Sequence, residues 1–70
     1  MPDSLTWDDS FAIAIILKRL HPGVLMEAVS LQDIYCWTIA LPDFEDDVDL
    51  CNDAILMAIY QEWFEEENAV

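Results

Sequence analysis

Apolar residues recur at helical spacing in three segments of the chain, and each segment predicts a helix. The first helix is expected over residues 9–20, where apolar side chains stand three and four positions apart. Asp8, Asp9 and Ser10 supply oxygens that can accept hydrogen bonds from the unpaired amides of its first turn. Pro22 follows its last turn and ends it.

The second helix is expected over residues 31–41. Ser30 and Asp33 have the spacing of a capping box at its start. Pro42 ends it, because the residue before a proline is pushed out of the helical conformation. The connection from the first helix, residues 23–29, could be a loop or a short extended piece, and the pattern does not decide between them.

The third helix is expected to begin between residues 50 and 52 and to run to about residue 66. Asp49 or Asn52 could cap its first turn. Glutamates fill its last turn, where negative charge opposes the helix dipole, so we expect fraying after Phe64.

The three helical periods converge on one core, which predicts an all-α, mainly helical fold. We expect a single domain over residues 1–70, with residues 1–4 and 67–70 frayed. Trp7, Trp37 and Trp63 are expected to be buried anchors. The predicted core consists of Ile13, Leu17, Leu20, Ile34, Trp37, Leu41, Ile55, Ile59 and Trp63.

Charge excludes several classes of partner. The chain has 2 Lys or Arg against 15 Asp or Glu and a net charge of −13, so it cannot form the basic surface that nucleic acid or an anionic membrane requires. Its longest apolar run, residues 11–17, is far below the ~20 residues of a membrane span. Cys36 and Cys51 have no metal-binding or redox spacing, so we expect reduced thiols in a soluble cytoplasmic protein.

The densest chemical feature is a run of carboxylates between the second and third helices, which we call the acidic loop (residues 43–49). Its hard oxygen ligands suit Fe²⁺, Mn²⁺, Mg²⁺ or Ca²⁺, although the spacing of a calcium EF-hand is absent. A solvated loop that caps the third helix is the alternative, and spacing alone leaves both open. The candidate metal ligands are Asp43, Glu45, Asp46 and Asp47.

Catalytic chemistry has little support in the sequence. His21 is the only histidine, and its place at the end of the first helix is explained by compensation of the helix dipole. Gly23 is the only glycine, so a glycine-rich phosphate loop is impossible. We therefore do not expect an enzyme.

Three motifs give the chain a resemblance to a known family. They occur in order and at matching separations: Leu5-x-Trp7-x-Asp9-Ser10, then Asp43-Phe44-x-Asp46-Asp47, then Asn52-x-x-Ile55-Leu56-x-Ala58-Ile59. With them, the sequence resembles the IscX family, small acidic accessory proteins of bacterial iron–sulfur cluster assembly, from about residue 5 to residue 66.

The resemblance implies a fold, partners and a function. The expected fold is a modified, winged-helix-like domain of three helices. The expected function is that of an acidic adaptor that binds a cysteine desulfurase and weakly binds Fe²⁺ through surface carboxylates, so that it modulates sulfur or iron delivery. The residues that match the family's acidic face are Asp8, Asp9, Asp33, Asp46 and Asp47. An iron donor, or a stable acidic domain without activity, stays open as an alternative.

Several positions depart from the family pattern. Apolar residues at Ala12, Ile15 and Met57 replace expected acidic or polar ones, Val48 replaces a proline, and Cys51 replaces a serine cap. Apolar side chains on wet faces favour self-association. We expect a monomer that could self-associate through Ile15 and Met57.

Overall fold

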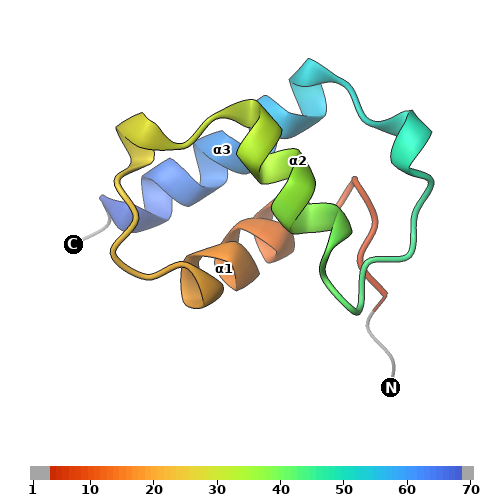
Figure 1. The fold of residues 1–70 in the computed structure, drawn as a ribbon, viewed down its shortest axis with the longest axis horizontal. Coiled ribbons are helices and arrows are strands. Elements are labelled where there is room, and N and C mark those ends of the chain that lie inside the picture. The colour runs from red at the N-terminus through yellow and green to blue at the C-terminus, as the bar shows by residue number, and fades with distance from the viewer. Residues whose placement is uncertain (1–3, 69–70) are drawn as a thin grey trace.

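The structure, a computed structural model, describes residues 4–68. Three helices alternate with two short 3-10 turns (Figure 1). In chain order the elements are α1 (Ser10–Leu20), η1 (Met26–Ala28), α2 (Leu31–Ile39), η2 (Val48–Leu50) and α3 (Asp53–Glu67). No strand is present in residues 4–68, whose single extended pairing is an isolated parallel bridge between Leu5 and Phe44. The prediction of an all-α fold is confirmed. The winged-helix-like arrangement implied by the family resemblance stays a prediction.

Helix α1 begins where the sequence indicates, but the expected side-chain cap is absent. Asp9 holds the N-cap position without capping the helix. Its carboxylate instead accepts a hydrogen bond from the Thr6 amide at 3.0 Å, which closes a turn just before α1. Asp9 therefore does not supply the cap that was expected from Asp8, Asp9 and Ser10, because the preceding Thr6 amide competes for its oxygen.

Helix α2 carries the predicted capping box. The Ser30 hydroxyl accepts from the Asp33 amide and the Asp33 carboxylate accepts from the Ser30 amide, both at 3.1 Å. The helix ends at Ile39, two residues before the predicted end. There the Leu41 amide donates to the Thr38 carbonyl, which tightens the last turn ahead of the proline.

Helix α3 is capped by Asn52, whose side chain accepts from the Ile55 amide at 2.9 Å. The chain before it forms η2 as a separate turn. The helix continues to Glu67, past Phe64, after which fraying was predicted. The fraying expected for residues 1–3 and 69–70 lies outside the described residues. Donors outside the helix explain its length: the Asn68 side chain donates to the Phe64 carbonyl and Lys18 Nζ donates to the Glu66 carbonyl.

The core lies among all three helices and the extended N-terminal segment. Its buried apolar residues are Leu5, Trp7, Ile13, Ala14, Leu17, Val29, Ile34, Leu41, Leu56, Ile59 and Trp63. Six of the nine predicted core residues belong to this set, while Trp37 and Ile55 are half-buried against it. Leu20 is exposed and was predicted wrongly, because α1 ends there.

Helices α1 and α3 pack most extensively against each other, and α2 crosses over both (Figure 1). The connection between α1 and α2 contains η1, so it is neither a plain loop nor an extended strand. This arrangement sends the chain that leaves α2 along the edge where the N-terminal segment enters α1. Among the described residues, no helix has the length and apolar character to cross a membrane.

Candidate functional site

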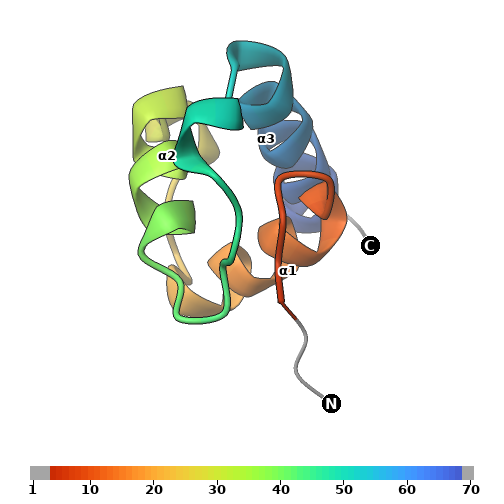
Figure 2. The ribbon, with the colours of Figure 1, turned by 90° about the vertical axis from the view of Figure 1, so that its right-hand side faces the viewer.

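The acidic loop and the N-terminal segment form one folded unit. The Leu5 amide donates to the Asp43 carbonyl at 2.8 Å, and the Glu45 amide donates to the Leu5 carbonyl at 2.9 Å. The Ser4 hydroxyl also donates to the Glu45 carboxylate at 2.8 Å. Figure 2 shows the two segments side by side at one end of the molecule. The acidic loop is therefore held by the N-terminal segment rather than solvated on both sides.

Trp7 anchors this unit to the core. The side chain is only 3% exposed, and its indole N–H donates to the Asp47 carbonyl at 2.9 Å. The ring meets Phe44 edge-on at 4.6 Å between centroids and lies parallel to Tyr35 at 6.2 Å. The prediction of a buried anchor at Trp7 is confirmed, and the structure adds that this anchor positions the acidic loop.

Asp46 and Asp47 direct their carboxylates toward backbone amides. Asp46 accepts from the Trp7 amide at 3.0 Å with one oxygen and from the Asp47 amide at 2.7 Å with the other. Asp47 accepts from the Asp49 amide at 2.9 Å, which caps η2. Two of the candidate site residues thus shape the loop as well as contributing charge.

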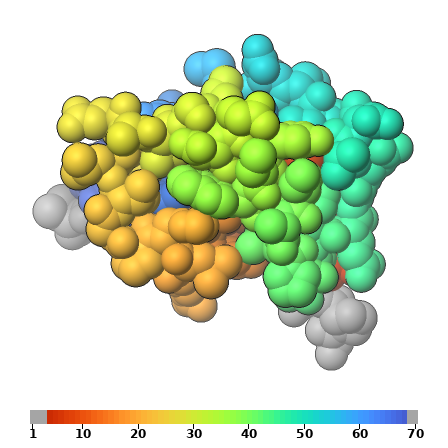
Figure 3. Space-filling view, in the orientation of Figure 1, coloured from red at the N-terminus to blue at the C-terminus, as the bar shows by residue number. Residues whose placement is uncertain are grey.

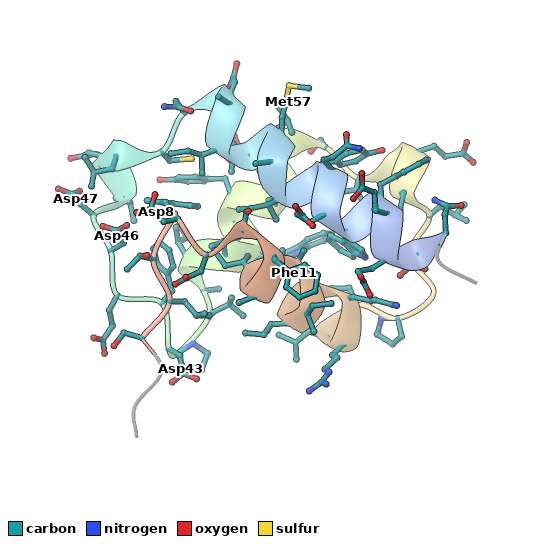
Figure 4. All side chains as sticks on the ribbon, turned by 180° about the vertical axis from the view of Figure 1, so that it is seen from behind. Asp8, Phe11, Asp43, Asp46, Asp47 and Met57 are labelled. Atoms are coloured by element: carbon teal, nitrogen blue, oxygen red, sulfur yellow. The ribbon has the colours of Figure 1, made fainter. Side chains whose placement is uncertain are left out.

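Asp8, Asp43 and Asp49 are the exposed carboxylates of this end that accept no hydrogen bond within residues 4–68. Figure 4 shows Asp8 close to Asp46 and Asp47, with Asp43 farther along the same edge. The only cations of the sequence, Lys18 and Arg19, lie at the opposite end of α1. The negative potential at this end is therefore not neutralised by neighbouring side chains.

The other two predicted partner-binding residues lie outside this cluster. Asp9 uses its carboxylate in the turn before α1. Asp33 uses its own in the capping box at the N-terminus of α2, whereas the acidic loop follows the other end of that helix. We define the acidic end of the molecule by Asp8, Asp43, Glu45, Asp46 and Asp47.

The structure does not gather the four candidate metal ligands into a preformed site. Among residues 4–68, no group of three or more His, Cys, Asp or Glu side chains is arranged to hold a metal ion. Asp43 is displaced from Asp46 and Asp47, as Figure 4 shows, and Glu45 is bonded to Ser4. A metal at the loop would compete with amides for oxygens that already accept hydrogen bonds.

A shallow depression lies next to the acidic loop, between α2 and the start of α3. Tyr35 and Leu56 supply apolar surface there, and Asp49, Cys51 and Asp53 lie among its polar lining. Burial and the nearby Asp53 carboxylate raise the pKa of the Cys51 thiol. Because a raised pKa lowers the thiolate fraction, Cys51 is a poor nucleophile and a poor metal ligand. Both cysteines are free thiols, as the sequence predicts.

The apolar departures differ in exposure. Met57 is largely exposed and points outward from α3, away from α1 (Figure 4). Ile15 is half-buried. Phe11, which the sequence analysis did not single out, is also exposed on α1. The helical period places it opposite the buried Ile13 and Leu17, and that signal could have identified it. Self-association through Ile15 and Met57 stays a prediction.

Comparison with known proteins gives two findings. The sequence profile of a family described as iron-sulphur cluster assembly matches residues 5–68. An uncharacterized protein of Pseudomonas aeruginosa is 37% identical over 65 residues, which cover 93% of this chain and 98% of that protein. The matched span contains the N-terminal segment, the acidic loop and all three helices.

Proposed function

The chain belongs to the iron–sulfur cluster assembly family also called the IscX family, and within that role we propose that it is an acidic, non-catalytic adaptor of a cysteine desulfurase. In this proposal the acidic end binds a surface rich in Lys and Arg on the desulfurase. Binding then modulates the delivery of sulfur to the assembling cluster.

The observation that carries the proposal is the concentration of carboxylates at one end of a protein with a charge of −13. A field of one sign speeds the encounter with an oppositely charged surface and repels like-charged competitors. Asp46 and Asp47 are held by amides, so little side-chain freedom is lost when a cation approaches them. Asp8 and Asp43 are exposed and available to pair with Lys or Arg.

Single-charge variants test the location of the interface. Asp8→Asn removes one charge at the acidic end. Glu65→Gln removes one charge from the exposed surface of α3, where, among residues 4–68, Glu65 accepts a hydrogen bond only from Gln61. The net charge of the two variants is equal, so a titration against a cysteine desulfurase compares position alone.

We expect Asp8→Asn to weaken binding about threefold or more at low salt, and Glu65→Gln to change it by less than about twofold. Equal effects of the two variants would contradict an interface at the acidic end. If Met57→Glu abolished binding while Asp8→Asn did not, the interface would be an apolar contact on α3 rather than an electrostatic contact at the acidic end.

Weak iron binding is the second candidate, favoured by the run of carboxylates along the acidic loop in the sequence, at Asp43, Glu45, Asp46 and Asp47. Residues 4–68 hold no preformed metal site, so iron would have to draw these side chains together. Since no imidazole or reactive thiolate joins them, we expect a weak site that exchanges Fe²⁺ with Mn²⁺ or Ca²⁺. The protein would then donate or buffer iron.

An anaerobic Fe²⁺ isotherm and Mn²⁺ broadening of amide resonances test this candidate together. Saturable binding with broadening confined to the acidic loop supports it. Broadening elsewhere in the chain would move the site, and the absence of both metal and desulfurase binding would indicate a stable acidic domain without activity.

A further inference from the structure

A second candidate surface lies at the end of the molecule opposite the acidic loop. A groove runs there between the turn that contains η1 and the last turns of α3. Its apolar walls are Val24, Leu25 and Met26 on one side and Phe64 on the other. Figure 3 shows the turn that contains η1 at the left end of the molecule, far from the acidic loop at the right.

The groove is held open by contacts beneath it. The Tyr60 hydroxyl donates to the Met26 carbonyl at 3.0 Å and so ties η1 to α3. The Tyr60 ring also stacks on Phe64, with 6.3 Å between centroids. Phe64 belongs to a turn that Asn68 caps. Because both walls are fixed from within, a ligand would not have to order them.

The rim of the groove is acidic. Glu27 lines it from η1 and Glu67 from α3, and the Glu67 carboxylate is held by the indole N–H of Trp63 at 3.3 Å. Apolar walls between two carboxylates are complementary to an apolar side chain with cationic neighbours. We propose that this groove binds a short segment of a partner protein in which one or two large apolar residues are flanked by Lys or Arg.

Other occupants fit the groove less well. A second copy of this chain carries the same charge of −13, so the long-range repulsion between two copies opposes dimerisation. An anionic membrane is repelled for the same reason. The groove holds about 300 Å³, at the lower limit for small-molecule pockets, and it is open to solvent, so it suits side chains better than an enclosed ligand.

The groove is independent of the acidic end. The longest dimension of the domain is 31 Å, and the two surfaces lie at opposite ends of it (Figure 1). One partner can therefore occupy the groove while another occupies the acidic loop. This second surface does not depend on desulfurase binding, and its test uses neither desulfurase nor iron.

The probe is a blocked hexapeptide with the sequence Lys-Lys-Leu-Leu-Lys-Lys, titrated into the isotopically labelled full chain and followed by amide chemical shifts. A control peptide has alanine in place of both leucines and keeps the charge. The matched protein variants are Leu25→Ser in the groove and Leu50→Ser on η2, whose side chains are 64% and 60% exposed. Urea unfolding of both variants verifies that they are folded.

We expect the leucine peptide to shift amides of residues 24–27 and 64–68, and the alanine peptide to shift these amides much less at the same concentration, because it keeps only the charge contacts with the rim. Leu25→Ser should weaken the leucine-specific binding about fivefold, and Leu50→Ser should change it by less than about twofold. Glu27→Gln, at the rim of the groove, and Glu65→Gln, outside it, each remove one charge and test the contribution of the rim in the same way. Identical maps for the two peptides, equal effects of the two serine variants, or no shifts at millimolar peptide would each overturn the proposal.

Discussion

Asp46 allows a direct test of whether the acidic loop is a folded element. Its carboxylate accepts hydrogen bonds from the amides of Trp7 and Asp47, and the first of these joins segments 39 residues apart in the chain. Asp43 lies in the same loop, is exposed, and accepts no side-chain hydrogen bond within residues 4–68. Asp46→Ala and Asp43→Ala therefore remove the same charge but different contacts.

The expected difference follows from those contacts. A hydrogen bond to a charged group contributes roughly 1.5–3 kcal/mol, and the bond to the Trp7 amide is partly buried. The bond to the Asp47 amide is exposed, so solvent weakens it to about 0.5 kcal/mol, the low end for an ordinary protein hydrogen bond. Loss of one negative charge relieves repulsion in both variants, so this contribution to the free energy of unfolding cancels when the two are compared. Asp46→Ala should thus be about 2 kcal/mol less stable than Asp43→Ala.

Urea unfolding followed by tryptophan fluorescence and by circular dichroism measures this difference. Asp46→Asn keeps one acceptor oxygen, so its stability should fall between that of the wild type and that of Asp46→Ala. If Asp46→Ala and Asp43→Ala unfolded at the same urea concentration, the loop would not be held as described. These stability measurements also decide which acidic residues are suitable for binding studies. A variant that loosens the loop would lose binding through loss of structure as well as through loss of charge.

Three further outcomes follow from burial. Trp63→Ala should cost about 3–5 kcal/mol in urea unfolding, because this side chain is fully buried, whereas the half-buried Trp37→Ala should cost clearly less; equal costs would contradict the described core. Thr38→Val should raise stability by about 1 kcal/mol, since its buried hydroxyl has no hydrogen-bond partner within residues 4–68, and a loss of stability would show that the hydroxyl is satisfied. Thiol labelling at pH 8 should modify the exposed Cys36 before Cys51, whose pKa is raised by burial, and labelling of Cys51 should accelerate as the pH increases.

Local chemistry explains which parts of the fold the sequence predicts. The capping box at Ser30 and Asp33 lies within four residues, so its partners are visible in the sequence, and the start of α2 is correct. Asn52, one of the two caps that the sequence offers for the third helix, also lies within four residues of its partner, the Ile55 amide. The prediction that Leu20 lies in the core was wrong because periodicity identifies the face of a helix that is buried. It does not show how far along the helix the packed neighbouring elements extend.

The candidate site depends on contacts that no local pattern encodes. Asp46 is bonded to Trp7 and Glu45 to Ser4, and these partners meet only when the chain folds. The alternation of Leu5 and Trp7 with polar neighbours is a signal of an extended segment, but it does not identify the segment's partner. The acidic loop therefore looks like a metal-binding cluster in sequence, whereas in the structure several of its carboxylates bind amides.

We propose that the acidic end recognises a cysteine desulfurase by charge, and the salt dependence of the association rate constant decides whether it does. Rim charges are screened by added ions, whereas close packed contacts are not. Between about 0.05 and 0.5 M salt the association rate constant should fall by about tenfold or more, while the dissociation rate constant should change by less than about threefold. An association rate constant that did not respond to salt, or the absence of a complex at low salt, would contradict the account.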